Sequence, residues 1–197
     1  RIPVAPAAHY TVGGVKTDLT GRTNIPHLYV CGELASSGIM GANRLASNSL
    51  IECLVFGKRA VEDSVCNRRE APIPETTPLF SLNHQKLDAY LSLKNKVADI
   101  MTQEAGIIRT ENGLQEGLET LLRLEQTEIF EENEYYSLVS KNLLTVAELI
   151  IRSALFRKES RGGHFRSDYP TPNDDYVCHI IQQKGKEIKT TPVILNN

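Results

Sequence analysis

The residues best suited to bind a small molecule lie in the first 50 positions of the sequence. These residues are His9, the glycine pair Gly13 and Gly14, Glu33 and Arg44. An arginine offers a planar, two-pronged donor that matches a carboxylate, and a histidine becomes of interest only beside the glycine pair and this arginine. A carboxylate such as Glu33 can accept hydrogen bonds from ribose hydroxyls, as in dinucleotide-binding folds. These residue types favour a ligand that carries carboxylates or a ribose.

Each of these residues also has an ordinary structural explanation. Glu33 could cap a helix or a turn, and Arg44 could be a solvated arginine or the partner of a surface acid. A single histidine such as His9 is often packed at the start of a strand without any ligand. A glycine-rich turn such as GxxGANR before a helix is common in proteins that bind nothing there. The hypothesis of a site therefore depends on their occurrence together.

The stretch 28–57, LYVCGELASSGIMGANRLASNSLIECLVFG, is expected to position these residues. Its pattern predicts a buried strand at LYVCG, a loop rich in Gly and Ser, and a helix that begins near Asn43. This arrangement presents backbone N–H groups and the positive end of a helix dipole to an anionic or electron-rich ligand. Arg44 would lie in the first helical turn, where the dipole disfavours a cation, so carboxylate binding is one reason for its presence. The apolar residues that recur near helical spacing are Leu45, Leu50, Leu54 and Val61.

The first 32 residues are expected to form a strand pair that leads into this stretch. Two prolines in residues 1–8 fit an extended entry segment. HYTVGGVKTD is typical of a strand broken by a glycine pair, which usually marks a bulge or a close approach of the backbone. LTGRTNIP predicts a turn, and HLYVCG predicts the returning strand.

Length and composition limit the classes of function. The chain has 197 residues, a net charge of -2 and 41% hydrophobic residues, which predicts one globular domain or two small ones. No apolar run approaches the roughly 20 residues of a membrane span, and no basic stripe with interleaved aromatics indicates nucleic-acid binding. The four cysteines are widely spaced, which favours free thiols in a reducing cytoplasm over disulfides or a metal site. Because the first residue is Arg1 and no targeting segment follows, we expect an internal piece of a longer protein.

The second half of the sequence has a different pattern. A proline-rich linker is expected at 71–80, after a helix that fades between Asp63 and Arg69. Apolar residues then recur at helical spacing in three segments up to Lys158, which predicts an antiparallel three-helix bundle. No ionisable cluster interrupts these apolar stripes, so we interpret the bundle as a scaffold. A polar loop, ESRGGHFRSDYPTPNDD, and a β-hairpin around residues 184–186 complete the chain.

Four motifs together carry a resemblance to a known family. HYTVGG, CGE, GANRLASNSLIECLVFG and SRGGHFRSDYP resemble the succinate dehydrogenase and fumarate reductase flavoprotein family. The resemblance covers nearly the whole chain, as the C-terminal part of such an enzyme without its Rossmann half. It implies an α+β fold, with the C-terminal segment of an FAD-binding α/β domain at 1–70. The linker at 71–80, the three-helix bundle at 81–160 and a C-terminal loop and hairpin at 161–197 would follow.

The resemblance also implies roles for individual residues. His9 and Arg44 would bind the carboxylates of the substrate, and Glu33 would hold the ribose of FAD. The residues that would lie along the flavin ring are Asn48, Ser49 and Leu50. A dicarboxylate needs two cationic or donor groups to fix its orientation, so this assignment is physically coherent. The arginine that transfers protons in the family lies upstream, so no catalytic residue is assigned and the chain alone is expected to be inactive and free of FAD.

Within the family, the chain resembles the branch that oxidises L-aspartate to iminosuccinate, the first step towards quinolinate in NAD biosynthesis. Respiratory members tend to have Gly at the position of Ala46 and Asp at that of Glu52, and the short tail also fits the L-aspartate branch. Electrons would pass to oxygen or fumarate, and quinolinate synthase is a candidate downstream partner. One alternative is a fumarate reductase or succinate dehydrogenase flavoprotein subunit. Another is a non-enzymatic helical interaction module, which would explain residues 80–160 but not HYTVGG with GANR.

Overall fold

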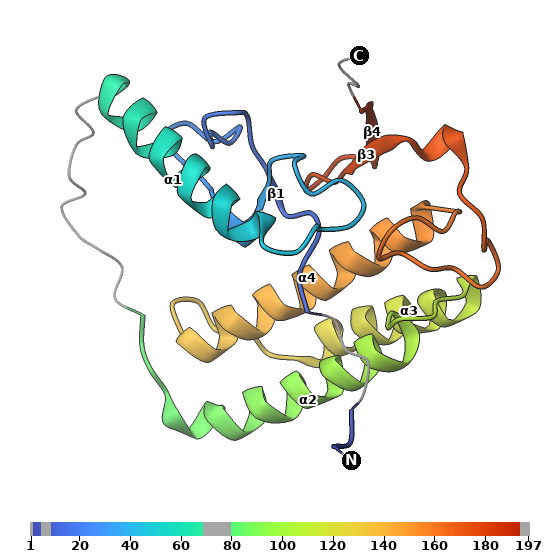
Figure 1. The fold of residues 1–197 in the computed structure, drawn as a ribbon. Coiled ribbons are helices and arrows are strands. Elements are labelled where there is room, and N and C mark those ends of the chain that lie inside the picture. The colour runs from blue at the N-terminus through green and yellow to red at the C-terminus, as the bar shows by residue number, and fades with distance from the viewer. Residues whose placement is uncertain (1, 5–8, 69–79, 194–197) are drawn as a thin grey trace. The chain divides into compact units, whose positions relative to one another are not determined.

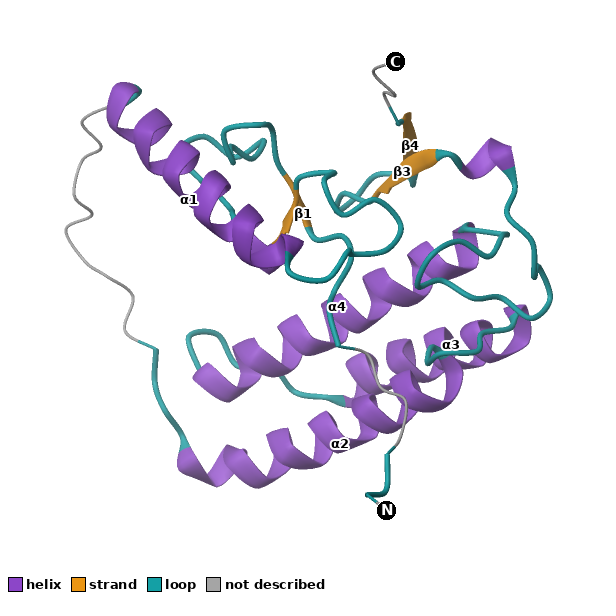
Figure 2. Ribbon diagram, viewed as in Figure 1, coloured by secondary structure: helices purple, strands orange, loops and turns teal. Residues whose placement is uncertain are grey.

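The computed structural model describes residues 2–4, 9–68 and 80–193 (Figure 1). Contacts between residues divide the chain into two compact units, Arg1–Ile73 and Pro74–Asn197. The mixed composition of helices and strands that the sequence predicts is confirmed (Figure 2). The expected linker lies outside the described residues except for its last position. No helix of the described part is long and apolar enough to cross a membrane.

The first unit is built around one long helix, α1 (Asn48–Cys66). The prediction that this helix begins near Asn43 is wrong, because Ser47 adopts a left-handed backbone conformation with φ 69° and interrupts helical geometry. Arg44 consequently lies in the loop before the helix and not in its first turn. The dipole argument for Arg44 therefore does not apply, and its role has to be argued from its contacts.

The strands of the first unit are short (Figure 2). β1 (Val15–Lys16) pairs in parallel with β2 (Ala35–Ser36). The predicted returning strand at 27–32 is wrong, since this segment contributes only one isolated bridge, between Arg22 and Tyr29, to the described pairing. Left-handed residues at both of its ends, His27 with φ 67° and Gly32 with φ 76°, interrupt the extended backbone that a strand needs.

Gly14 marks a close approach of two backbone segments. A Cβ atom at this position would overlap the carbonyl oxygen of Leu34, at the end of the 3-10 helix η1 (Gly32–Leu34). Its φ of +148° is also one that side-chain-bearing residues rarely adopt. Gly14 thus marks a close approach to the backbone at Leu34 and not to a flat or bulky group, whereas Gly13 has open space around it.

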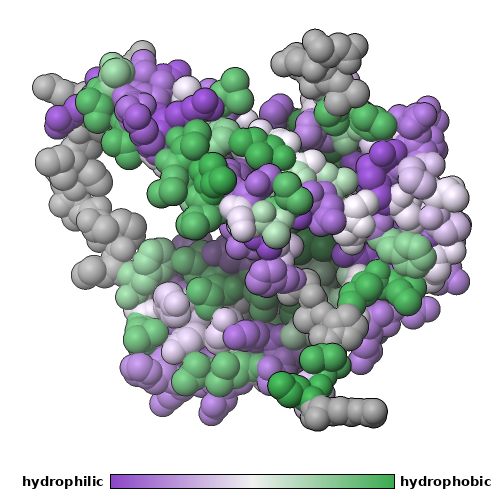
Figure 3. Space-filling model, in the orientation of Figure 1, coloured by the Kyte–Doolittle hydropathy of each residue, from purple (hydrophilic) through white to green (hydrophobic). Residues whose placement is uncertain are grey.

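Helix α1 buries a narrow face and exposes a wide apolar one. Its buried residues are Glu52, Phe56 and Ala60. The predicted stripe lies on the exposed side: Leu45 is 72% exposed, Leu50 68%, Leu54 68% and Val61 63%. In Figure 3, hydrophobic side chains accordingly lie at the surface over α1. The periodicity indicates the helix correctly, but this unit does not cover that face.

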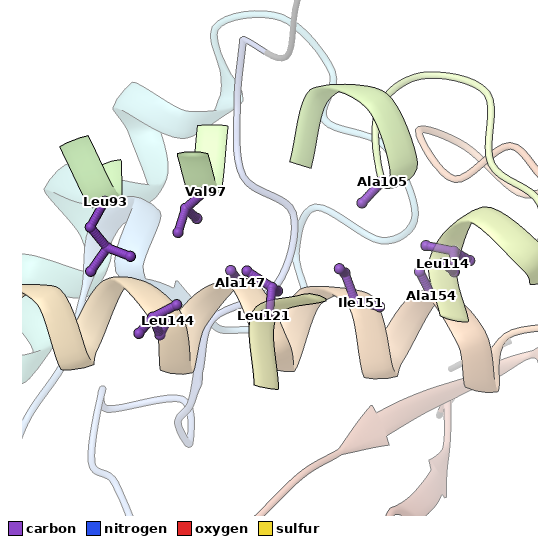
Figure 4. Close-up of a cluster of buried hydrophobic side chains, with 9 residues drawn as sticks. All are labelled: Leu93, Val97, Ala105, Leu114, Leu121, Leu144, Ala147, Ile151 and Ala154. Atoms are coloured by element: carbon purple, nitrogen blue, oxygen red, sulfur yellow. The ribbon is translucent and has the colours of Figure 1, made fainter. Parts of the chain in front are cut away.

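The second unit contains three helices that share one core: α2 (Leu87–Glu104), α3 (Glu111–Thr127) and α4 (Tyr135–Phe156). Each of them contacts the other two. The buried core residues, shown in Figure 4, are Leu93, Val97, Ala105, Leu114, Leu121, Leu144, Ala147, Ile151 and Ala154. Most follow one another at three, four or seven positions along a helix, the spacing that keeps side chains on one face.

Side chains cap two of these helices. Thr110 Oγ1 accepts a hydrogen bond of 3.1 Å from the backbone N–H of Gly113, at the start of α3. At the start of α4, the buried carboxylate of Glu134 accepts hydrogen bonds from the backbone N–H groups of Tyr136 and Ser137. These bonds satisfy N–H groups that have no partner within the helix, so they define where each helix begins.

The predicted C-terminal hairpin is present. β3 (Cys178–Ile181) pairs antiparallel with β4 (Lys189–Pro192), with Ile181 opposite Lys189. Gly185 supplies a left-handed conformation, with φ 72°, to the connection between the strands. Gln182 joins this hairpin to α4, because its Nε2 donates to the Leu149 carbonyl oxygen at 2.7 Å.

Candidate functional site

Arg44 is the centre of the candidate site in the first unit. Its guanidinium carbon lies 4.4 Å from the centroid of the Tyr10 ring, a cation–π arrangement. Its Nη1 donates a hydrogen bond of 2.7 Å to Ser49 Oγ, in the first turn of α1. Arg44 is half-buried between these partners. Two segments that are separate in the sequence, one with Tyr10 and one with Arg44 and Ser49, therefore meet at one guanidinium.

His9 directly precedes Tyr10 in the chain. Its side chain is exposed, so the structure does not support the alternative of a packed histidine at the start of a strand. Because the Tyr10 ring contacts the Arg44 guanidinium, His9 is the direct neighbour in sequence of a residue that touches Arg44. The fold thus brings the two residues that resemble a substrate-binding pair into the same part of the unit.

Glu33 connects the segment that carries Tyr10 to η1. Its Oε1 accepts a hydrogen bond of 2.9 Å from the backbone N–H of Thr11. Glu33 lies in the first turn of η1, not just past the end of a strand as the sequence suggested. Among the described residues the Glu33 carboxylate accepts from Thr11, so Glu33 links two segments and does not cap the turn considered above.

The start of α1 offers backbone donors. Asn48, Ser49 and Leu50 form its first turn, and Ser47 makes no side-chain cap hydrogen bond within the described residues. First-turn N–H groups have no partner inside the helix, and the helix dipole makes this end positive. Leu50 is 68% exposed and can pack against a flat apolar surface. The backbone N–H of Asn48 already donates to the Leu45 carbonyl oxygen at 3.2 Å.

A buried carboxylate fixes the loop that leads to Arg44. Glu52 of α1 is 3% exposed and accepts a hydrogen bond from Ser37 Oγ. Ser37 Oγ in turn accepts a hydrogen bond from the backbone N–H of Ile39 at 3.4 Å. In the sequence analysis, Glu52 served only to distinguish branches of the family. Glu52 shares the buried face of α1 with Phe56 and Ala60. This burial depends on how other segments pack against the helix, which the sequence pattern does not reveal.

Tyr10 is a contact of Arg44 that the sequence analysis missed. Partial burial raises the pKa of its phenol, the carboxylates of Glu52 and Glu33 raise it further, and Arg44 opposes them. The ring therefore stays neutral under ordinary conditions and presents an intact π face to the guanidinium. The only local signal is its position next to His9, because nothing in the sequence pairs it with a residue 34 positions later.

The second unit contains buried ions that the sequence analysis did not foresee. Arg166 is fully buried, and its Nε and Nη2 donate to the two carboxylate oxygens of Asp168 at 2.8 and 2.7 Å. Its Nη2 also contacts Glu111 at 2.8 Å, and its Nη1 donates to the Ala154 carbonyl oxygen. The hydrogen bonds from Arg166 lower the pKa of Asp168 to about 2.

Glu159 is a second fully buried ion in the same loop. It accepts hydrogen bonds from the guanidinium groups of Arg157 and Arg161 and from the backbone N–H of Asn173. Burial alone would raise the pKa of Glu159, but the bonds from Arg161, Asn173 and Arg157 hold it below its ordinary value. The hydrogen-bond partners of Arg166 and Glu159 described here thus all belong to the second unit.

His164 lies between two arginines of this unit. Its Nδ1 is 2.9 Å from Arg109 Nη1, and its Nε2 is 3.0 Å from the Arg157 carbonyl oxygen. Because a guanidinium can only donate, Nδ1 accepts and Nε2 carries the proton. Burial lowers the pKa of His164, and the charges of Arg109, Arg157 and Arg166 lower it further. The SRGGHFRSDYP motif therefore has a structural explanation, and no metal-binding group of His, Cys, Asp and Glu occurs among the described residues.

Comparison with known families identifies the class of protein. Residues 94–197 match the family described as Fumarate reductase flavoprotein C-term, and residues 1–50 match the family described as FAD binding domain. The first match covers more than half of the chain. The chain therefore belongs to the succinate dehydrogenase and fumarate reductase flavoprotein family.

The individual curated relatives described here are L-aspartate oxidases. An L-aspartate oxidase from Nostoc sp. is 40% identical over 93% of this chain and 37% of its own length. L-aspartate oxidase 2 from Ralstonia nicotianae is 43% identical over 86% of this chain and 31% of its own length. The chain thus spans about a third of the curated relatives it matches.

Two solved structures share the fold of this chain. A mutant of E. coli quinol fumarate reductase FrdA is similar with a TM-score of 0.74 and 29% identity, over 99% of this chain and 38% of that chain. Sdh1 from Mycobacterium smegmatis is similar with a TM-score of 0.67 and 26% identity, over 94% of this chain and 35% of that chain.

Proposed function

We propose that this chain is part of a flavin-dependent enzyme that oxidises L-aspartate to iminosuccinate, the first step towards quinolinate in NAD biosynthesis. The observation that carries the proposal is the state of Arg44. Its guanidinium is half-buried, its contacts are the neutral groups of Tyr10 and Ser49, and no carboxylate of the described residues forms an ion pair with it. A guanidinium in this state favours an anionic ligand such as a substrate carboxylate.

Two residues would hold the substrate. Arg44 binds one carboxylate of the dicarboxylate in a two-pronged contact, and the exposed imidazole of His9 donates to the other. Two fixed ends leave the substrate little rotational freedom, so the carbon that carries the amine keeps one orientation. Because these two residues recognise only the carboxylates, the amino group must be recognised elsewhere in the parent protein.

Four residues of this chain would hold the cofactor. Glu33 accepts from the ribose, while Asn48, Ser49 and Leu50 lie along the flavin ring, where the α1 N–H groups favour negative charge. FAD, when bound, would supply the acceptor for the hydride, two electrons and one proton, that leaves the substrate carbon, and the route for the electrons to oxygen or fumarate. The chain alone lacks the other contacts of a large cofactor, so we expect it to be colourless and inactive after purification.

The substrate must react as a neutral amine, because the developing iminium needs the nitrogen lone pair. The amine loses its proton before the carbon–hydrogen bond breaks, so the rate should rise between about pH 6 and pH 8.

The remaining parts of the proposal concern organisation. Residues 1–70 form the C-terminal segment of the FAD-binding domain and 71–80 the linker. Residues 81–160 form an antiparallel three-helix bundle that acts as a scaffold, and 161–197 form the C-terminal loop and hairpin.

The four free cysteines support a reducing, cytoplasmic location. Iminosuccinate made here would be consumed by quinolinate synthase as the downstream partner.

A respiratory flavoprotein subunit is the second candidate, and the similarity to the FrdA and Sdh1 structures favours it. Against it, Ala46 and Glu52 differ from the residues that respiratory members tend to have, and the relatives at about 40% identity are L-aspartate oxidases.

Turnover of the full-length protein distinguishes the two candidates. It should be measured with L-aspartate and with succinate, under air and under argon with fumarate. We expect oxidation of L-aspartate under both conditions and poor oxidation of succinate. Rapid bleaching of the flavin by succinate, with none by L-aspartate between about pH 6 and pH 8, would favour the respiratory candidate.

A further inference from the structure

We propose that Tyr10 is a positioning residue which, together with Ser49, sets the guanidinium of Arg44 in place before a carboxylate ligand arrives. This inference depends on the proposed function only in that Arg44 binds a carboxylate. It assigns Tyr10 a role through the face of its ring and gives the Ser49 hydroxyl a role in holding Arg44.

The contacts of Arg44 leave part of its binding edge available. Tyr10 covers one face of the planar guanidinium at 4.4 Å, and Ser49 Oγ accepts from Nη1 at 2.7 Å. The hydrogen bonds recorded for Arg44 within the described residues use only Nη1. The Nε and Nη2 donors form the parallel pair that a carboxylate engages in a two-pronged contact.

The Arg44 side chain needs support from Tyr10 and Ser49 because the backbone around it is a loop and does not fix its position. It lies in the loop that precedes α1, and nearby Gly38 and Gly41 both have positive φ angles with open space around them. A long arginine side chain that moved freely would lose rotamer freedom when the ligand binds, which weakens binding. A stacked ring on one face and a hydroxyl at one end remove much of that freedom in advance.

Tyr10 is itself held in place. The backbone N–H of the next residue, Thr11, donates to Glu33 Oε1 at 2.9 Å, which ties this segment to η1. The phenol stays neutral because burial, Glu52 and Glu33 raise its pKa. Since the contact with Arg44 uses the ring face, a phenylalanine should replace Tyr10 without loss, whereas an aliphatic residue should not.

The test uses the full-length, FAD-loaded protein and the variants Tyr10→Leu, Tyr10→Phe and Ser49→Ala. Tyr29→Leu serves as the matched control, since the Tyr29 hydroxyl donates to Asp63 and, among the described residues, the ring that stacks on Arg44 is that of Tyr10. The measurements are the Kd of succinate by calorimetry, KM and kcat for L-aspartate, and the melting temperature of each variant.

Tyr10→Leu should raise both the succinate Kd and the KM by about 10-fold, the scale of one partly desolvated cation–π contact, with a smaller change in kcat. Tyr10→Phe and Tyr29→Leu should stay within about two-fold of wild type, because neither removes that contact. Ser49→Ala should show an intermediate rise, because only one neutral hydrogen bond is lost.

Three results would separate this inference from the proposed function. If Tyr10→Leu binds succinate as tightly as wild type, the positioning role is wrong even when the wild type oxidises L-aspartate. The role is also wrong if Tyr10→Phe is as impaired as Tyr10→Leu, since the hydroxyl would then matter. Weaker succinate binding by Tyr10→Leu alone, in a protein that does not oxidise L-aspartate, would support the positioning role and overturn the proposed activity.

Discussion

The two units of this chain use their apolar residues in opposite ways. In the second unit, leucines such as Leu114 and Leu121 are almost completely buried in a core shared by three helices. In the first unit, Leu50 and Leu54 of α1 are each 68% exposed, and Phe56 is the large apolar side chain that the described part buries. The second unit therefore has a core of its own, whereas the first displays a helix face that its own residues do not cover.

Their arginines differ in the same way. Arg166 of the second unit is fully buried among carboxylates, so it has no capacity for a ligand. Arg44 of the first unit is half-buried and contacts a ring and a hydroxyl, both neutral. The comparison indicates that Arg166 stabilises the fold of the second unit, while Arg44 of the first unit is available for binding.

The largest effect on stability should come from Arg166→Ala. This change leaves the carboxylates of Asp168 and Glu111 without their buried partner, which should cost about 3–5 kcal/mol of unfolding free energy. The measurement is urea unfolding of the chain, followed by the helical circular dichroism signal. The matched control is Arg152→Ala, which removes a more exposed pair with Glu148 and should cost about 0.2–1 kcal/mol. Equal costs for both variants would remove the distinction between the buried cluster and surface charge.

A pair of leucine variants tests the packing difference directly. Leu121→Ala removes a side chain that is 2% exposed, and should cost about 2–5 kcal/mol of unfolding free energy. Leu54→Ala removes one that is 68% exposed, and should stay within about 0.5 kcal/mol of wild type. Thermal and urea unfolding of this chain would measure both. A large cost for Leu54→Ala would mean that the chain covers α1 in solution.

Arg44→Lys should affect catalysis and leave stability nearly unchanged. Lysine keeps the charge but loses the planar two-pronged donor, so the full-length enzyme should lose about 2–4 kcal/mol of transition-state stabilisation in kcat/KM. Its FAD content should stay near normal. Arg59→Lys is the control, because Arg59 also lies over an aromatic ring, that of Phe56, but outside the candidate site. Loss of flavin, with normal activity in the molecules that retain it, would make Arg44 a cofactor or structural residue.

The smallest predicted effect is a pH dependence of stability in the second unit. Folded His164 has a lowered pKa, so between its ordinary value of 6.5 and the folded value the unfolded chain binds more protons. Unfolding free energy should therefore fall as the pH drops below 6.5, by at most about 1.4 kcal/mol per pH unit. In His164→Gln this part of the slope should be absent. Identical slopes for both proteins between pH 7 and pH 5 would contradict the assignment.

The helices of the second unit could be predicted because their signals are local. Apolar residues at helical spacing indicate α3, and Thr110, a residue type that favours helix starts, caps it. The first unit was predicted less well, because its boundaries depend on left-handed residues such as His27 and Ser47. Neither is a glycine, and nothing in the neighbouring sequence marks these conformations.

The candidate site was predicted in part. The residue types of His9, Glu33 and Arg44 indicate carboxylate and ribose chemistry, and the family resemblance gives each a role that remains a prediction. The contact between Tyr10 and Arg44 and the burial of Glu52 depend on how distant segments pack, which no single-sequence pattern encodes.

Hydrogen exchange of the full-length, FAD-loaded protein with and without succinate tests the central claim most directly. That claim places ligand binding in the first unit and gives the helices of the second unit a supporting role. Succinate should slow exchange in peptides that cover residues 9–14 and 43–50, and should leave α2, α3 and α4 unchanged. Protection confined to the helices of the second unit, with none around residues 9–14, would contradict it.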